Sequence, residues 1–254
     1  MTNSIPAPSA QAPSSLGAMA QSQATPARFS AAAGPLHTVL LLVALAVWCF
    51  WFNVMADQLA ASARPDRLRL YAITILFEWL LFGFAVWGVR RHGAPLALVL
   101  GKPWQSAKEV FRDIALAFGF WIVALIILRT VAWLVHVNPA SKVLLSLLPS
   151  SPVEIAVWVV VATTAGICEE TLFRGYLQRQ FMALTRSAPA GIILSALLFG
   201  AAHIYQGLRM VVVIAVFGSL FGILAYWRKS TRSGMIAHTW QDALSGIVGG
   251  LTHH

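Results

Sequence analysis

Charged side chains are scarce in this sequence. Only 11% of its 254 residues are Asp, Glu, Lys or Arg, whereas 58% are hydrophobic, and the mean hydropathy is +0.73. A soluble globular domain carries about 25% charged residues, so this chain lacks the polar surface that would cover it in water. The composition excludes an ordinary soluble domain and predicts an integral membrane protein.

Acidic residues and cysteines are fewer still. Nine Asp and Glu stand against 18 Lys and Arg, which gives a net charge of +9. On a membrane protein such an excess indicates basic loops that face anionic lipid headgroups, so we do not expect nucleic acid as a partner. Cys49 and Cys168 both fall within apolar runs and do not indicate a disulfide framework.

The first 35 residues also lack charge, with Arg28 as the one exception, and they are rich in Ala, Ser, Pro and Gln. Such a composition cannot bury a core, so residues 1–35 are predicted to be a disordered tail. No basic stretch precedes a short apolar run there, and we expect no cleaved signal peptide.

Seven apolar runs follow the tail. A helix needs about 20 mostly apolar residues to cross the ~30 Å hydrocarbon core, and its backbone groups must pair within the segment. The runs are 36–56, 70–89, 114–137, 155–168, 188–208, 210–227 and 233–251. We therefore predict an all-α, polytopic transmembrane helical bundle of about seven spans, with six to eight as the range. Residues 36–150 would supply three N-terminal transmembrane helices.

The last hundred residues hold ionisable side chains within or beside these runs. Such a side chain is costly at the bilayer centre, so each one is a candidate functional residue. The candidates are Glu169, Glu170, Arg174, His203, His238 and Asp242. A spacing of four places Glu170 and Arg174 on one helical face, and likewise His238 and Asp242.

The candidates also have structural interpretations. Arg174 could simply support Glu170 in an interfacial ion pair, and a lone histidine such as His203 often only satisfies a hydrogen bond. Glu78 and Arg129 are the single charges of two earlier runs. They could form a buried pair between helices, and we interpret both as structural.

Three motifs in this region resemble one family. Residues 169–176, EETLFRGY, resemble the EExxxR signature of the CaaX-processing and bacteriocin-processing (CPBP) intramembrane endopeptidases. Residues 195–203, SALLFGAAH, resemble the FxxxH motif, and residues 234–242, GMIAHTWQD, resemble the third motif, HxxxN or HxxxD. The resemblance covers about residues 153–250. It implies a glutamate-type membrane protease, similar to type II CaaX prenyl proteases, with residues 151–254 as the peptidase core.

The first motif would supply the base. A carboxylate in surroundings of low dielectric constant is a usable general base near neutral pH, and we assign the activation of water to Glu169. Glu170, held by Arg174, would fix the geometry of Glu169. On straight antiparallel helices Glu169 and His203 would lie at different depths. A long fourth helix that extends through about Gln180, or a fifth helix that starts deeper, would bring them together.

The other two motifs would handle the water and the oxyanion. The resemblance implies that His203 orients the water and that His238, with residue 242, faces the oxyanion. Many relatives carry Asn at this last place, whereas this chain has Asp242. An ionised carboxylate repels an oxyanion, whereas an amide donates a hydrogen bond to it. Asp242 is therefore protonated, orients His238, or helps to bind a metal.

A zinc site is the alternative to the glutamate mechanism. Two histidines and two carboxylates could form a zinc shell with room for a water, namely Glu169, His203, His238 and Asp242. Their spacing is not the HExxH of helical zinc peptidases. We favour a mechanism without a metal or another cofactor.

Two other classes of membrane protein could use the same residues. A non-enzymatic immunity or scaffold protein of the same fold would hold them as a structural polar network. A proton-coupled transporter would use them as a relay, but the internal repeats that transporters often show are not visible. We favour an endopeptidase of the bacterial inner membrane that contacts membrane lipids. Its substrates would be membrane-associated proteins or peptides, of the CaaX type or with leader peptides.

The basic residues outside the spans predict the orientation. With the N-terminus in the cytoplasm, 12 Lys and Arg would lie inside and five outside. The five are Arg64, Arg67, Arg69, Lys142 and Arg209. Because basic residues are enriched on the cytoplasmic side, this asymmetry favours a cytoplasmic N-terminus and an external C-terminus.

The orientation can be tested with reporter fusions. We expect reporters at the N-terminal tail and in the loop 228–232 to be active on the same, cytoplasmic side, because an even number of spans separates the two positions in the predicted bundle. A fusion after residue 142 is the control and should report the opposite side. Opposite locations for the tail and the loop 228–232 would contradict the predicted span count.

Overall fold

The computed structural model describes residues 29–138 and 141–252, and the elements within these ranges are all helical. The main helices are α1 (Pro35–Ala61), α2 (Arg67–Arg91), α4 (Ala107–Leu134), α6 (Pro152–Glu169), α7 (Gln178–Thr185), α8 (Ala188–Ala202), α9 (Leu208–Arg228) and α10 (Arg232–Thr252). Between them lie the short α3 (Ala97–Leu100) and α5 (Lys142–Leu147) and the 3₁₀ turn η3 (Ile204–Gln206). The prediction of an all-α polytopic bundle is confirmed.

Five helical segments of the described chain are long and apolar enough to cross a membrane. They are α1, α2, α4, the continuous helix Pro152–Thr185, and α9. The apolar α8 has only 15 residues, and α10 does not belong to the five. The prediction of about seven spans depends on these last two helices and stays a prediction.

Polar caps set where several helices begin. The side chain of Asp66 accepts a hydrogen bond from a backbone N–H at the start of α2, and Ser106 and Ser151 do the same for α4 and α6. Each serine is followed by an acid three residues later, Glu109 and Glu154, whose carboxylates accept hydrogen bonds from Gln105 N and Ser150 N. Such caps satisfy N–H groups that a helix leaves unpaired. They explain why α4 begins before residue 114, where the predicted apolar run starts.

The first motif lies in the middle of one long helix. α6 passes directly into the π-helical segment η2 (Glu170–Leu177) and then into α7, so that the helix runs from Pro152 to Thr185. All eight residues of η2 are buried. Segments of π-helix are rare and are frequent at functional sites. A long fourth helix is therefore the arrangement that the chain adopts.

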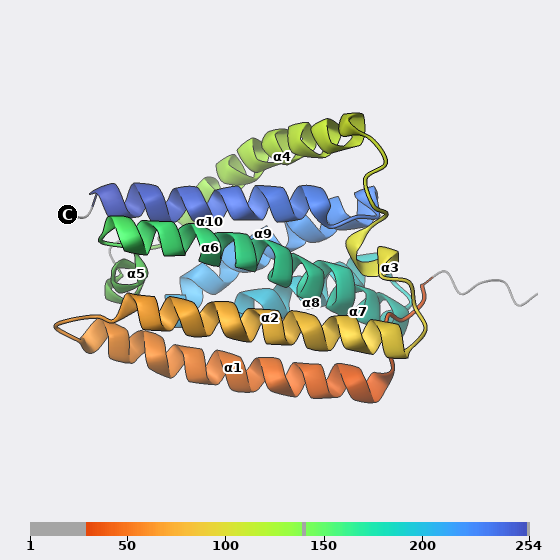
Figure 1. Ribbon diagram of the computed structural model, residues 1–254, viewed down its shortest axis with the longest axis horizontal. Coiled ribbons are helices and arrows are strands. Elements are labelled where there is room, and N and C mark those ends of the chain that lie inside the picture. Colours follow the sequence, from red (N-terminus) through yellow and green to blue (C-terminus); the bar gives the residue numbers. More distant parts are fainter. Residues whose placement is uncertain (1–28, 139–140, 253–254) are drawn as a thin grey trace, which may run out of the picture.

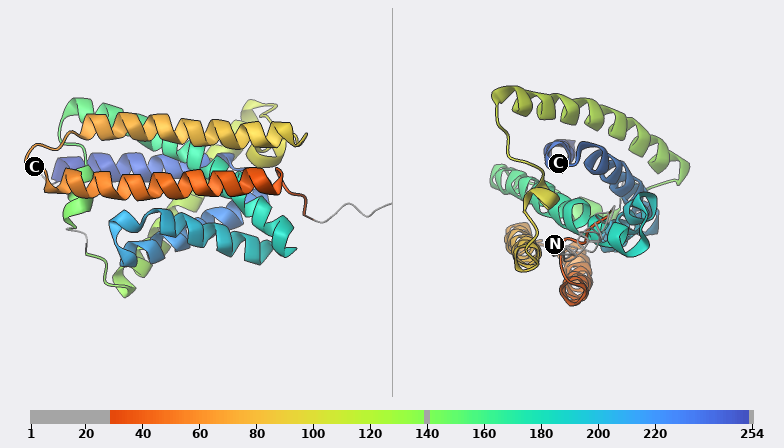
Figure 2. Two further views of the ribbon diagram at one scale, coloured as in Figure 1. Left: turned by 90° about the horizontal axis from the view of Figure 1, so that it is seen from below. Right: turned by 90° about the vertical axis from the view of Figure 1, so that its right-hand side faces the viewer.

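This long helix occupies the centre of the bundle. Figure 1 shows α6 between α2 and α10, with α1 beside α2 and α4 on the outside of α10. The pair α8 and α9 packs on the other face of η2 and α7, as the views in Figure 2 show. The largest fully buried side chains come from several of these helices and include Tyr176, Phe199, Phe221 and Leu41. The core thus centres on η2.

The chain between α8 and α9 differs from the prediction. The apolar run 188–208 predicts one helix, but α8 ends at Ala202 and is followed by η3. Gly207 then adopts a φ of +93°, in the left-handed region that favours glycine, and α9 begins at the next residue. The break places His203 at the C-cap position of α8.

Candidate functional site

Glu170 and Arg174 form a buried ion pair on η2. Arg174 Nη1 lies 2.9 Å from Glu170 Oε1, and the two side chains are 1% and 0% exposed. The Arg174 guanidinium carbon also lies 4.1 Å from the centre of the Phe199 ring and within 6 Å of the Phe217 and Phe221 rings. A desolvated guanidinium over aromatic faces gains cation–π attraction. The ion pair that the spacing of four predicts is therefore present, and it packs between α8 and α9.

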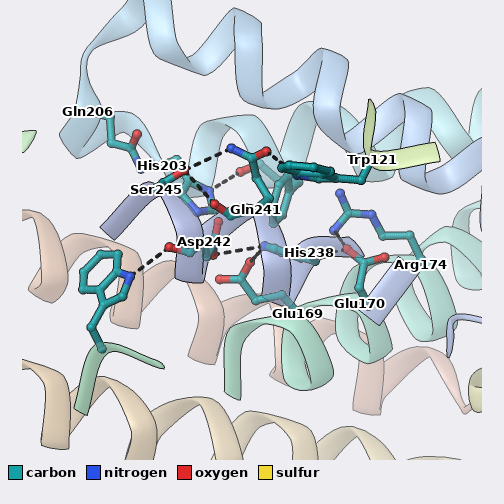
Figure 3. A network of polar contacts seen from close by, with 12 residues as sticks. Trp121, Glu169, Glu170, Arg174, His203, Gln206, His238, Gln241, Asp242 and Ser245 are labelled. Atoms are coloured by element: carbon teal, nitrogen blue, oxygen red, sulfur yellow. Dashed lines mark hydrogen bonds and ion pairs between the residues drawn. The ribbon is translucent and has the colours of Figure 1, made fainter. Parts of the chain in front are cut away.

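His238 of α10 links this pair to the other two carboxylates. Its Nδ1 lies 3.0 Å from Glu170 Oε1, and its Nε2 lies 3.4 Å from Asp242 Oδ2 and 3.7 Å from Glu169 Oε2 (Figure 3). Both ring nitrogens thus face carboxylates. The predicted pairing of His238 with Asp242 is present, and it extends into a cluster of four ionisable side chains plus Arg174.

Glycines allow α6 and α10 to approach closely enough for these contacts. A Cβ on Gly166 would lie 2.8 Å from the Met235 carbonyl oxygen, and a Cβ on Gly234 would lie 3.1 Å from Glu170 Oε2. The carbonyl of Asp242 accepts a hydrogen bond of 2.8 Å from the indole N–H of Trp158, which fixes α10 against α6 about two turns further along. The local sequence therefore brings the first and third motifs side by side.

Exposure divides the cluster into two parts. The side chains of Glu170, Arg174 and His238 are at most 4% exposed, whereas those of Glu169 and Asp242 are 18% and 37% exposed. A fully buried ion pair suits a supporting role, because no substrate reaches it. Glu169 and Asp242 are the acids of the cluster that water or a substrate can contact.

Glu169 opens into a small cavity that also contains His203. The cavity has a volume of about 90 Å³, enough for a few water molecules. His203 Nδ1 lies 2.9 Å from the Phe199 carbonyl oxygen. Because a carbonyl only accepts, Nδ1 is the donor, and in the neutral ring Nε2 keeps its lone pair. The second motif thus meets the first across the cavity rather than by direct contact.

One cavity residue was not expected in the site. Glu78 of α2 lines the same cavity as Glu169, and its Oε2 is buried with no hydrogen-bond partner among the described residues. The pair between Glu78 and Arg129 that we considered does not form, and Arg129 is exposed on α4. Helices α1 and α2 supply about half of the cavity wall, including Trp48 and Cys49. The sequence does distinguish Glu78, since it is the one charged residue of its apolar run, and a charge within a span is a candidate functional residue.

The side chains as they stand do not make a metal-binding group. Within residues 29–138 and 141–252, no three His, Cys, Asp or Glu side chains lie together in a way that could hold a metal ion. The four residues of the zinc alternative therefore do not form such a group in this arrangement.

The fold and the cluster define a multi-pass membrane protein with a carboxylate–histidine site among its helices. The family model of Rce1-like type II CAAX prenyl endopeptidases matches residues 149–244, which contain all three motifs. The matched family is a family of proteases, and the match confirms the resemblance noted from the motifs for this part of the chain. No curated protein and no solved structure matches the chain.

Removing Arg174 should destabilise the protein. Arg174→Ala removes the guanidinium that lies 2.9 Å from the buried carboxylate of Glu170, and breaking a buried ion pair typically costs about 3–5 kcal/mol. We expect a lower yield and a lower melting temperature of the purified protein in detergent. Arg129→Ala removes an exposed arginine from α4 and is the control, for which we expect little change. Equal melting temperatures for the two variants would contradict a stabilising role of the buried pair.

Proposed function

We propose that the chain is an intramembrane endopeptidase that hydrolyses peptide bonds with a water activated by Glu169. The observation that carries the proposal is that Glu169 faces a water-sized cavity within a domain of a protease family. The carboxylate is held near His238 on one side and faces His203 across the cavity on the other. Peptide hydrolysis needs a base, an oriented water and stabilisation of the oxyanion, and this arrangement offers a group for each.

In the proposed first step, Glu169 takes a proton from a water in the cavity, and the water oxygen attacks the carbonyl carbon of the scissile peptide bond. The free Nε2 of His203 accepts a hydrogen bond from the same water and orients it. The C–N bond then breaks, and Glu169 returns the proton to the amine that leaves. Glu170 and Arg174 do not touch the substrate and serve as positioning residues.

His238 is the proposed group for the developing negative charge. Because carboxylates face both of its nitrogens, the ring is held with a proton on each and carries a positive charge. A fixed positive group in a site that excludes water stabilises an oxyanion strongly. Asp242 then acts by orienting His238, which is one of the three roles that its replacement of Asn leaves open.

The proposed substrates are proteins or peptides associated with the membrane, of the CaaX type or with leader peptides. The proposal also places the protein in the bacterial inner membrane with its N-terminus in the cytoplasm. A substrate can be found by comparing the membrane proteomes and protein C-termini of cells with and without the gene. A non-enzymatic role is the alternative, because the buried Glu170–Arg174–His238 network would stabilise the fold equally well without catalysis.

Replacing Glu169 tests the proposed base. Glu169→Gln keeps the shape of the side chain but removes the basic carboxylate, so the protein should fold while hydrolysis of such a substrate falls by ~10²–10⁴. We expect His203→Ala and His238→Ala to be nearly as damaging, since groups that act as a unit give non-additive losses. Asp57→Asn alters an exposed acid of α1 and is the control that should keep the wild-type rate.

The outcomes separate the two functions. Cleavage by the Glu169→Gln variant at the wild-type rate would mean that the base is misassigned. If no substrate accumulates in cells without the gene, and the Gln variant supports every phenotype, the non-enzymatic role replaces the peptidase.

Metal analysis tests the proposed absence of zinc from the mechanism. We expect the protein purified in detergent to hold no stoichiometric zinc and to keep its activity after treatment with a chelator. A content of about one zinc per chain that is lost in Glu169→Ala or His203→Ala would show instead that these residues bind the metal.

A further inference from the structure

A second and larger cavity lies at the other end of η2, away from Glu169. It has a volume of about 1300 Å³ and is enclosed by the loop around α3, the start of α4, η2, and the turn between α9 and α10. In the topology predicted above, this end of the bundle faces the cytoplasm. We call it the basic cavity, because six cationic side chains besides Arg174 line it. They are Lys102, Arg112, Arg179, Arg228, Lys229 and Arg232.

The acids of the basic cavity do not balance these cations. Among the residues that the structure describes, only two carboxylates line it, Glu109 and Asp113. Asp113 pairs with Arg228 at 3.0 Å and accepts a hydrogen bond of 2.8 Å from the Trp104 indole N–H. Glu109 accepts a backbone hydrogen bond from Gln105. Both acids are therefore already engaged.

Most of the cations lack an anionic partner. Within the described residues, no carboxylate oxygen lies within 4.0 Å of Lys102, Arg112, Arg179 or Lys229. Arg179 is only partly exposed, and the Nε atom of Arg228 is buried without a hydrogen-bond partner in the same part of the chain. Lys102, Arg112 and Lys229 are exposed, but together with Arg179 they line one hollow, where their mutual repulsion favours a bound anion.

The walls of the basic cavity are held in place by the fold. Gly101 has a φ of +86° and packs against Ser230, and its carbonyl accepts a hydrogen bond of 3.1 Å from Arg232 Nη2. α3 packs on η2 where Gly175 meets the carbonyl of Val99. These contacts fix the loop after α2 to the turn before α10. The cations therefore project from helices and turns that are packed against one another.

Exposed aromatic rings at the rim indicate the depth of the site. Trp104, Tyr226 and Trp227 line the basic cavity and are 42%, 44% and 66% exposed. Trp and Tyr are enriched where a membrane meets water, at the level of the lipid headgroups. Arginine side chains bind phosphate groups through paired charge-assisted hydrogen bonds. The cations therefore lie at the depth where phospholipid phosphates are found.

We propose that the basic cavity binds a phosphate-bearing anion, for which the aromatic rim favours the headgroup of an anionic phospholipid over a soluble phosphate compound. The bound phosphate lies between Arg112 of α4, Arg179 of α7 and the turn before α10. It thereby links α4, on the outside of the bundle, to the helix that carries Glu169 and Glu170. Arg174 belongs to both places, since it lines the basic cavity and pairs with Glu170.

Lipid binding by the full-length protein tests this site. The protein, purified in neutral detergent, is offered phosphatidylglycerol or phosphatidylcholine, and bound lipids are counted by native mass spectrometry. We expect phosphatidylglycerol to be retained in preference to phosphatidylcholine. The double variant Arg112→Gln/Arg179→Gln should weaken that binding about tenfold or more, the loss expected for charge-assisted hydrogen bonds. Arg64→Gln/Arg69→Gln removes the same charge from exposed positions at the opposite end and should change little.

A second arm identifies the source of the phosphate. Inorganic pyrophosphate is titrated in the same detergent, and its binding is followed by the melting temperature. Stabilisation by pyrophosphate without retention of phosphatidylglycerol, lost in the Arg112/Arg179 variant, supports a soluble ligand of the same chemistry. Equal loss in the control pair, or binding of neither probe by the wild type, overturns the site. Because hydrolysis is not measured, failure here leaves the proposed peptidase function untouched.

Discussion

The buried charge of Arg174 is the constraint on which the packing of the C-terminal helices depends. A guanidinium inside a bundle without water is stable only when an anion and suitable acceptors surround it. Glu170 supplies the anion from the same segment, at 2.9 Å, and His238 joins that carboxylate from α10. Phe199 of α8 and Phe217 of α9 offer their ring faces to the guanidinium. One ion pair therefore determines how η2, α8, α9 and α10 meet.

The same packing gives the adjacent residues Glu169 and Glu170 different surroundings, which match the different roles that we propose for them. Successive side chains on a helix point roughly 100° apart, so Glu169 and Glu170 face different surroundings. Glu170 points into the packed core and is 0% exposed, whereas Glu169 turns toward α1 and α2 and is 18% exposed. A pair of adjacent acids thus gives one rigid anchor and one accessible carboxylate. Fixing Glu170 limits the freedom of Glu169, which suits the role of a preorganised base that we propose for Glu169.

Local patterns in the sequence predict most of the fold and part of the site. Long apolar runs predict the helices, and a spacing of four predicts the pairs Glu170–Arg174 and His238–Asp242, because both effects act within one helix. Contacts between distant helices are not encoded in such patterns. The place of Glu78 in the Glu169 cavity, and the gathering of cations around the basic cavity, depend on which helices pack together. The suggested pairing of Glu78 with Arg129 was wrong for this reason.

Asp242 stands where the family motif often has Asn, and the geometry around His238 accommodates this difference. An Asn at this place would offer its amide N–H to an oxyanion, whereas a carboxylate cannot donate unless it is protonated. In this chain Asp242 Oδ2 lies 3.4 Å from His238 Nε2, and Glu170 holds the opposite nitrogen of the ring. A carboxylate that orients a histidine and stabilises its cation is an established catalytic device. In the proposed mechanism, the positive charge that stabilises the oxyanion resides on His238, and Asp242 beside it strengthens that charge instead of competing for it.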